Sequence, residues 1–361
     1  MDPRFIELQK AAAERADVIG LAGGLPADEL LPHEELGRAL AEVTTSREDA
    51  LQYGWPEGVE QLRTWIANRL AARGATVDPE RVIITAGAQQ ALSIVGALFS
   101  DRAIAVGDAT YPAAIDAFTR GGARVVARGG EARYLIAGVS NPQGVPGDER
   151  VGGTLIVDEA YAELRFDGKL PPLLLDDAPD RVWHIGTISK TLAPGLRVGW
   201  LVPPDAQHAA ALDLKHAADL QTASISQAAL ARMLSRLDYD AFVANARAAY
   251  TKRAAALVDG LHRHAPALRF TEPQGGFSIW IETDVKGDEI ALLEAALAEG
   301  VMIDPGSEFR PEPSPYIAFR LCYSHGAPEQ FDEGARRVAA MFEKFARGSR
   351  PRAVSGRAAE R

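Results

Sequence analysis

The sequence predicts an α/β protein, with a large domain built on a mainly parallel, doubly wound sheet and a smaller α+β domain after it. The first observation is a series of short, nearly all-apolar runs between residues 81 and 204, rich in Val and Ile. Such runs are typical of strands buried on both faces. Helical stretches lie between several of them, which favours parallel pairing. A new alternation of strands and helices begins after residue 270.

The runs that we expect to form the large sheet are, in order, "RVIITAG", "RAIAVGD", "ARVVARG", "RYLIAGVSN", "GTLIVDEAY", "VWHIGTI" and "VGWLVPP". After residue 205 the pattern becomes helical and ends in a long helix from Asp238 to about His264. The second pattern comprises the strands "GGFSIWIE", "VMIDPG" and "YIAFRLCYS", the helix "GDEIALLEAALAEG" and a final helix from Ala327 to Ala346.

These patterns divide the chain into four parts. We expect an N-terminal arm over residues 1–44 that packs against both domains, a large domain over 45–245 and a small domain over 246–345. Residues 346–361 are basic and poor in apolar side chains, so we expect a disordered tail.

Composition excludes several classes of function. The chain has 361 residues, of which 47% are hydrophobic and 24% charged, as in an ordinary globular protein. Its net charge of −10 argues against nucleic acid as a partner, because phosphate binding requires basic surface. A single Cys and scattered His residues predict neither disulfides nor a metal site. No apolar run reaches membrane-spanning length and no signal peptide is recognisable, so we expect a cytoplasmic protein.

Polar residues interrupt the apolar runs where the predicted strands end, at Gly87, Asp108, Asn141, Asp158, Ser189 and Lys190. Ligands of open parallel sheets bind at the carboxyl ends of the strands. Lys190 lies in the segment "TISKTLAPGLRVGW". Taken alone, a Lys beside a Pro-Gly turn is more often a solvated surface charge. The convergence of polar strand ends favours a buried Lys190 in a ligand site.

Three motifs at these ends suggest ligand contacts, each with a purely structural alternative. In "TAGAQQAL", Gly87, Ala88 and Gln89 begin a helix whose backbone N–H groups could bind an anion, although many such turns bind none. Tyr111 in "DATYP" could stack on a planar ligand or belong to the core. Asn141 in "SNPQG" could bond a ligand oxygen or only form a turn.

Charged residues inside the buried runs carry the strongest signal. An ionised Asp158 in "LIVDEAYAEL" is costly unless it faces a cation, the alternative being a cap for the following helix. Arg320 in "IAFRLCYS" requires a carboxylate, either from a substrate or from an internal acid such as Glu308. The segment "SKTLAPGLRVGW" supplies the amine of Lys190 for a Schiff base and Arg197 for a phosphate.

The order of these motifs resembles that of the class I/II aminotransferases, which are pyridoxal-phosphate enzymes of fold type I. Gly-x-Gln, Tyr-Pro, Asn-Pro-x-Gly, Asp-x-x-Tyr, the lysine segment and a C-terminal Arg follow one another between about residues 18 and 340. The segments "IGLAGGLP" and "LQYGWPEGVEQLR" resemble the aminoadipate and aromatic aminotransferases. That subgroup also resembles the effector domains of GntR-type regulators. The stretch 122–134 is shorter than is usual in the family.

The resemblance implies pyridoxal 5′-phosphate as cofactor and gives each motif a role. Lys190 would carry the cofactor and then move the substrate proton, and Asp158 would pair with the pyridine nitrogen. Tyr161 and Asn141 would hold the 3′-oxygen, and Tyr111 would stack on the ring. The phosphate would be bound by Gly87, Ala88, Gln89, Thr187, Ser189 and Arg197.

The resemblance also implies a substrate site and a partner. Arg320 would clamp the substrate α-carboxylate, with Gly24 on the opposite wall and Asn141 alongside. Tyr53 would reach the phosphate of the neighbouring subunit, which implies a homodimer. The implied activity transfers the amino group of an α-amino acid to a 2-oxo acid. Decarboxylation, elimination, cyclisation or oxidation on the same cofactor remain alternatives, as does a sensor domain that binds the cofactor without turnover.

Overall fold

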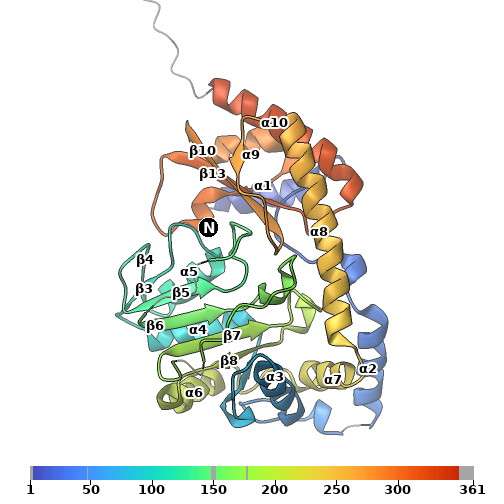
Figure 1. Ribbon diagram of the computed structural model, residues 1–361, viewed down its shortest axis with the longest axis vertical. Coiled ribbons are helices and arrows are strands. Elements are labelled where there is room, and N and C mark those ends of the chain that lie inside the picture. The colour runs from blue at the N-terminus through green and yellow to red at the C-terminus, as the bar shows by residue number, and fades with distance from the viewer. Residues whose placement is uncertain (1–2, 47, 148–151, 176–177, 349–361) are drawn as a thin grey trace, which may run out of the picture.

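The computed structural model describes residues 3–46, 48–147, 152–175 and 178–348. Two units lie one above the other in Figure 1, a large unit around a seven-stranded sheet and a smaller one around a four-stranded sheet. Helix α8 (Tyr239–His264) runs alongside both. It begins where the sequence predicts, because the side chain of Asp238 accepts a hydrogen bond from the N–H of Ala241.

The large sheet contains every strand that the apolar runs predict. Its strands are β2 (Ile83–Thr85), β3 (Ala103–Ala105), β4 (Arg124–Val126), β5 (Ala132–Ile136), β6 (Thr154–Asp158), β7 (Val182–Thr187) and β8 (Gly199–Val202), in the spatial order β2-β8-β7-β6-β5-β3-β4. The α/β class with a mainly parallel sheet is confirmed. Strand β8 alone runs antiparallel to both of its neighbours. The connection from β7 to β8 is too short for the crossover that parallel pairing needs.

Helices cover this sheet and leave the carboxyl ends of its parallel strands open. They are α3 (Glu60–Ala72), α4 (Ala88–Leu98), α5 (Pro112–Arg120), α6 (His208–Asp219) and α7 (Ser224–Leu234). Helix α4 packs on β2, β7 and β8, and its Leu92 and Val95 are completely buried. This packing places the N-terminus of α4 beside the end of β2, where Gly87 makes the turn.

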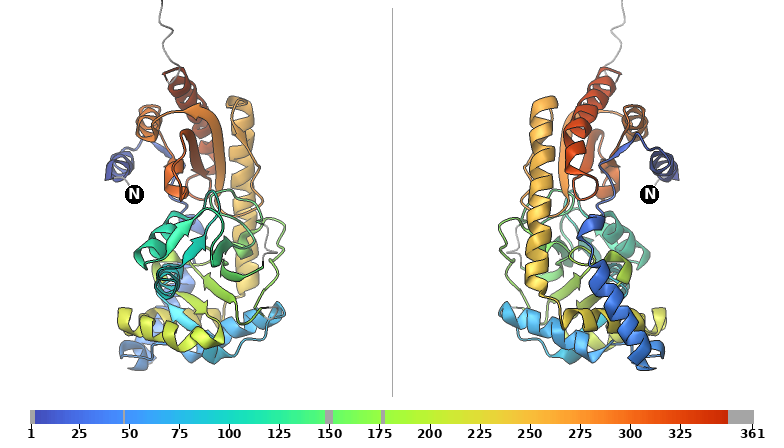
Figure 2. Two further views of the ribbon diagram at one scale, coloured as in Figure 1. Left: turned by 90° about the vertical axis from the view of Figure 1, so that its left-hand side faces the viewer. Right: turned by 90° about the vertical axis from the view of Figure 1, so that its right-hand side faces the viewer.

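The small unit combines the C-terminal part of the chain with the N-terminal arm. Strands β9 (Arg269–Phe270), β10 (Ser278–Lys286), β12 (Asp304–Pro305) and β13 (Tyr316–Cys322) form an antiparallel sheet in the order β12-β13-β10-β9. Strand β1 (Ile19–Gly20) pairs in parallel with β11 (Val301–Met302). Helix α9 (Glu289–Ala298) lies between α1 (Pro3–Ala13) and α10 (Phe331–Gly348), as the side views in Figure 2 show. Helix α2 (His33–Ser46) packs instead on α7 of the large unit.

Short 3-10 helices connect these elements at Asp28–Leu30, Glu48–Leu51, Pro79–Arg81, Ala162–Leu164, Pro194–Leu196, Asp205–Gln207, Gly306–Phe309 and Pro328–Gln330. The last α-helix continues to Gly348 and therefore includes the first three residues of the predicted tail, 346–348. Residues 349–361, where the rest of that tail falls, lie outside the described part.

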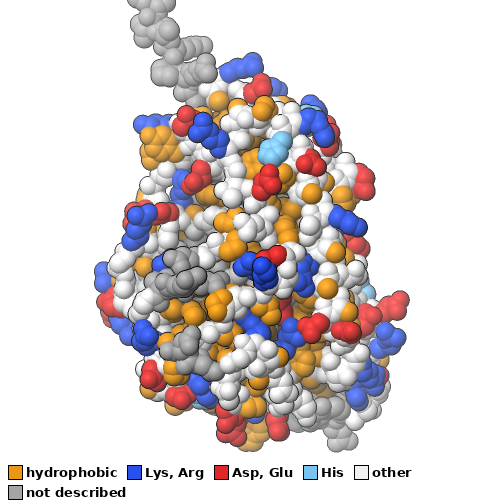
Figure 3. Space-filling view, viewed as in Figure 1, with side chains coloured by type: hydrophobic (Ala, Val, Ile, Leu, Met, Phe, Trp, Pro, Cys, Tyr) orange, Lys and Arg blue, Asp and Glu red, His pale blue; other side chains and the backbone are white. Residues whose placement is uncertain are grey.

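Within the described residues, no helix is both long and apolar enough to span a membrane. On the face drawn in Figure 3, basic and acidic side chains are interspersed.

Candidate active site

A pocket lies at the carboxyl ends of the parallel strands, where the polar residues of the sequence were expected to converge. It encloses about 610 Å³ free of protein atoms, part of it open to solvent. Its lining consists of Ala88, Gln89, Tyr111, Ile136, Asn141, Asp158, Ala160, Tyr161, Thr187, Ser189, Lys190, Pro194 and Arg197. Asp108 does not reach this pocket, because its exposed carboxylate pairs with Arg128 at the surface.

One end of the pocket is built to receive an anion. Helix α4 begins at Ala88, directly after Gly87, whose φ of 76° is in the region that favours glycine. A Cβ atom at Gly87 would lie 2.5 Å from Nη2 of Arg197, so the guanidinium occupies the space that the glycine leaves. The hydroxyl oxygens of Thr187 and Ser189 are 2.9 Å apart beside it. A helix N-terminus, two hydroxyls and a guanidinium together suit a phosphate group.

Asp158 is a buried carboxylate in the lining of the pocket. Its Oδ2 accepts a hydrogen bond of 2.8 Å from the hydroxyl of Tyr134, and its Oδ1 accepts one of 2.9 Å from the N–H of Ala160. Burial raises the pKa of Asp158, although both hydrogen bonds oppose this shift. Among the described residues, no Lys or Arg forms an ion pair with this carboxylate. The sequence left open that Asp158 only caps the following segment. The hydrogen bond from the N–H of Ala160 is such a cap, but it engages only Oδ1.

Lys190 projects from the segment after β7 toward the same pocket. Its Nζ donates a 3.1 Å hydrogen bond to the carbonyl oxygen of Gly24, and the rings of Tyr161 and Phe277 lie 5.6 and 5.7 Å away. Burial, reinforced by the positive charge of Arg320, lowers the pKa of Lys190 to about 8. The lysine is therefore a partly neutral amine near pH 7 to 8 rather than a surface charge.

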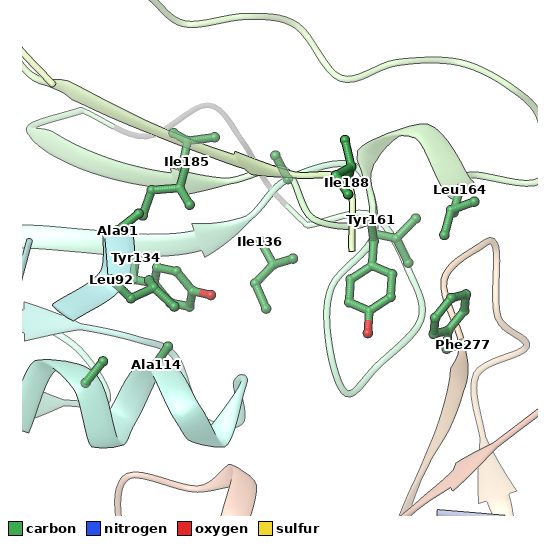
Figure 4. Packing of buried hydrophobic residues seen from close by; sticks show 14 of the residues in the cluster. Ala91, Leu92, Ala114, Tyr134, Ile136, Tyr161, Leu164, Ile185, Ile188 and Phe277 are labelled. Carbon is green, nitrogen blue, oxygen red and sulfur yellow. The ribbon is translucent and has the colours of Figure 1, made fainter. Parts of the chain in front are cut away.

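Tyr111 and Tyr161 line the pocket, and Tyr134 lies beside it through its hydrogen bond to Asp158. Figure 4 shows Tyr134 and Tyr161 on either side of Ile136, with Phe277 beyond Tyr161. The rings of Tyr161 and Phe277 pack edge to face at 5.3 Å, which orients the Tyr161 hydroxyl. Tyr111 is the N-cap residue of α5, and burial raises the pKa of its hydroxyl.

Arg320 has an internal carboxylate partner, which the sequence had left open as the alternative to a substrate carboxylate. Its Nε and Nη2 donate to Oδ2 of Asp304 at 2.9 and 2.7 Å, and its Nη1 donates to Oδ1 of Asn141 at 2.9 Å. The internal acid is thus Asp304 rather than Glu308. Arg320 and Asp304 face each other across β13 and β12, whereas Glu308 lies in the 3-10 helix that follows. Gly24 adjoins the guanidinium, within 4 Å of a Cβ built on that glycine.

Comparison with known proteins decides which of the sequence interpretations holds. The family model "Aminotransferase class I and II" matches residues 16–128 and 148–338. The chain belongs to the class I and II aminotransferases. It is 32% identical to the 2-aminoadipate transaminase of Thermus thermophilus, over 90% of each chain. The Pyrococcus horikoshii kynurenine aminotransferase, solved with PMP, superposes with a TM-score of 0.86 at 28% identity, covering 94% of each chain.

A transcriptional regulator is also similar to this aminotransferase. The HTH-type regulator YisV of Bacillus subtilis is 28% identical over 90% of this chain and 74% of the regulator. The predicted resemblance to aminoadipate enzymes and to regulators is therefore confirmed, together with fold type I. The protein is an aminotransferase that depends on pyridoxal phosphate, and the anion-binding end of its pocket and the unpaired Asp158 fit the two charged ends of that cofactor.

Tyr53 stands apart from the pocket of its own aminotransferase chain. Its side chain is 79% exposed and lies beside Trp55, which is 77% exposed. Both line a separate surface hollow near Ser224. A single chain therefore does not bring Tyr53 to Lys190. Within the described residues, no group of three or more His, Cys, Asp or Glu side chains could hold a metal ion.

Sequence reasoning missed two residues of this site, Tyr134 and Asp304. Each had a usable signal, since a polar group inside an apolar strand must find a partner. Tyr134 stands in "RYLIAGVSN" and Asp304 in "VMIDPG". The same argument had singled out Asp158, but it named no partner for either of these side chains. The partners come from other strands, and only the register of the sheets shows them.

Proposed function

We propose that this aminotransferase moves the amino group of an α-amino acid to a 2-oxo acid, with Lys190 as the residue that carries the cofactor. The observation that carries the proposal is the amine of Lys190, held in the pocket at a pKa of about 8 and close to the unpaired carboxylate of Asp158. When bound, pyridoxal phosphate supplies an electron sink for the bonds of the substrate α-carbon. The free amine of Lys190 would take the proton from the substrate α-carbon and deliver it to a different carbon, as transfer of the amino group requires.

Asp158 supports this chemistry from the lining of the pocket. Its carboxylate is held by Tyr134 and by the N–H of Ala160, and it lacks a cation of its own. A protonated pyridine nitrogen would supply that cation, and the ion pair would keep the ring protonated. Asn141 and Tyr161 line the same pocket and are the proposed partners of the 3′-oxygen.

The remaining contacts divide between cofactor and substrate. The phosphate would bind at the start of α4, with ligands from Gly87, Ala88, Gln89, Thr187, Ser189 and Arg197. Tyr111 would stack on the ring. The substrate carboxylate would bind Arg320 beside Gly24 and Asn141, where the guanidinium faces the glycine.

We also propose a homodimer in which Tyr53 completes the partner's site. Support comes from the exposed apolar side chains of Tyr53, Trp55 and Leu51, which is 66% exposed, and of Leu220, which is 54% exposed and precedes Gln221, the side chain that accepts a hydrogen bond from the N–H of Gly54. Such groups of exposed apolar side chains mark interaction surfaces. Mixed dimers test this, with one Lys190→Ala subunit and one Tyr53→Phe subunit. One intact site per mixed dimer should restore activity, whereas verified mixed dimers without activity would place Tyr53 elsewhere.

The function itself is tested by reduction and by a panel of amino donors. Borohydride treatment of the holoenzyme followed by peptide mapping should place the cofactor on Lys190, and Lys190→Ala should bind cofactor but lose transfer. Lys252→Ala, at an exposed lysine of α8, is the matched control. A cofactor adduct mapped to another lysine would contradict the assignment. Release of carbon dioxide, or of free ammonia without transfer of the amino group to an added 2-oxo acid, would indicate one of the other pyridoxal-phosphate reactions.

A further inference from the structure

The guanidinium of Arg320 is already partly satisfied by its own chain. An Arg side chain has five N–H groups. Nε and one N–H of Nη2 donate to Asp304, and one N–H of Nη1 donates to Asn141. Two N–H groups remain, one on each terminal nitrogen, and Gly24 packs against this end of the guanidinium, since a Cβ built on the glycine would lie 3.5 Å from Nη2 and 3.6 Å from Nη1. That end has the spacing of a carboxylate.

Asp304 is held firmly in place to make this contact. It lies directly opposite Arg320 in the pairing of β12 with β13, and each residue is no more than 7% exposed. The backbone N–H of Gly23 donates to both of its carboxylate oxygens at 3.1 Å. The ring of Phe309 packs against the guanidinium, 4.6 Å from its central carbon. Neither side chain can turn away without leaving a buried charge unpaired.

This pairing changes the charge that an incoming substrate meets. A lone buried Arg would attract any carboxylate strongly, because the interior screens charge poorly. Here the negative charge of Asp304 cancels that of Arg320 before substrate arrives. What remains is a directional pair of N–H donors without net charge. Recognition then depends on the fit of the carboxylate to two hydrogen bonds more than on long-range attraction.

We propose that Asp304 is a positioning residue that aims Arg320 and limits the affinity of the substrate-carboxylate site. Its contact engages Nε and Nη2, so the donors left for substrate are on the two terminal nitrogens, and its charge weakens the binding of any carboxylate there. The inference rests on the proposed role of Arg320 in the function above. With Asp304 in place, the site would select carboxylates by the geometry of two hydrogen bonds, and it would release a carboxylate product quickly.

The test compares Asp304→Asn with the wild-type holoenzyme, using propionate as a carboxylate probe. The amide keeps an acceptor for Arg320 but removes the charge. We expect Asp304→Asn to bind propionate at least about tenfold more tightly, measured from the concentration dependence of Tm. KM for an amino-acid donor should fall in parallel, with kcat unchanged or lower. Glu282→Gln, which removes the partner of Arg310 in the same sheet, is the control and should bind propionate like the wild type.

Asp304→Glu covers the case in which Asp304→Asn does not fold, because it keeps the charge. Its affinity for propionate should stay within about threefold of the wild type, and a tenfold gain would overturn the inference. Unchanged or weaker propionate binding in folded Asp304→Asn would also overturn it, since a merely structural role predicts that result. Arg320→Gln separates a failure of the proposed role of Arg320 from a failure of the proposed role of Asp304. If that variant binds propionate normally, the proposed role of Arg320 fails; if it does not, only the role of Asp304 is in question.

Discussion

Asp158 and Asp304 are both buried carboxylates beside the same pocket, but they belong to different sheets and have different partners. Asp158 ends β6 of the large sheet and is held by neutral donors, a tyrosine hydroxyl and a backbone N–H. Asp304 begins β12 of the small sheet and is bound to a guanidinium. The first is incomplete without a cation from outside the chain, whereas the second already has one. A buried acid therefore signals a ligand only when its own fold leaves its charge unpaired.

The largest effect should come from removing the unpaired charge. Asp158→Asn should lower kcat/KM by roughly a thousandfold, about 4 kcal/mol of transition-state stabilisation, because the ring nitrogen loses its counter-charge. The measurement is steady-state transfer by the purified variant. Asp108→Asn, another strand-end acid but one paired at the surface, should leave turnover unchanged. Near wild-type turnover in Asp158→Asn would reduce that residue to a local cap.

Arg320, the partner of Asp304, should contribute less to kcat/KM, and only for substrates that carry a carboxylate. Arg320→Lys keeps the charge but loses the planar fork, so kcat/KM for amino acids should fall about a hundredfold, on the order of 3 kcal/mol. Rates with a simple amine that lacks the carboxylate should change little. Arg310→Lys, in the neighbouring pair with Glu282, is the control. Equal losses for both kinds of donor would indicate a damaged fold.

Lys190 lies between the two regions, and its buried amine should make apoprotein stability depend on pH. Its pKa is lowered from 10.5 unfolded to about 8 folded, so the unfolded chain binds the proton more tightly. The free energy of unfolding should therefore be reduced below pH 8, and the deficit should disappear as pH rises from 8 to 10.5. Its size is on the order of 3 kcal/mol.

Lys190→Met removes this titration and is the reference for that measurement. Denaturant unfolding of both apoproteins across the same pH range isolates the contribution of the lysine, because all other groups are shared. A difference between them that does not vary with pH would contradict the lowered pKa.

The smallest effect concerns the hydrogen bond that holds Asp158. Tyr134→Phe removes one donor to a charged group, so kcat/KM should fall roughly tenfold, about 1.5 kcal/mol. The acidic limb of the profile of kcat/KM against pH should move to higher pH, because this hydrogen bond lowers the pKa of Asp158. Tyr323→Phe removes an equally buried hydroxyl, bonded to the carbonyl of Gly275, and should leave that limb in place. Identical pH profiles for all three proteins would assign Tyr134 to packing alone.

The architecture and much of the pocket could be predicted from the amino-acid sequence. Short apolar runs rich in Val and Ile favoured strands buried on both faces, and polar residues at the ends of parallel strands were expected to meet at one edge of the sheet. Asp158, Asn141 and Lys190 were found in this way, since the end of a parallel strand is both a sequence position and a place in space. The antiparallel direction of β8 was not visible, because an apolar run looks the same in either direction.

Tertiary structure alone decided which charges are paired. Asp304 and Arg320 are 16 residues apart, and Tyr134 and Asp158 are 24 apart, so no local pattern links them. Cross-strand register brings each pair together, and register depends on the packing of whole sheets. The sequence identified Arg320 as a buried cation in need of a carboxylate. It did not reveal that the chain supplies one, because the pairing energy comes from a contact made only after both strands are in place.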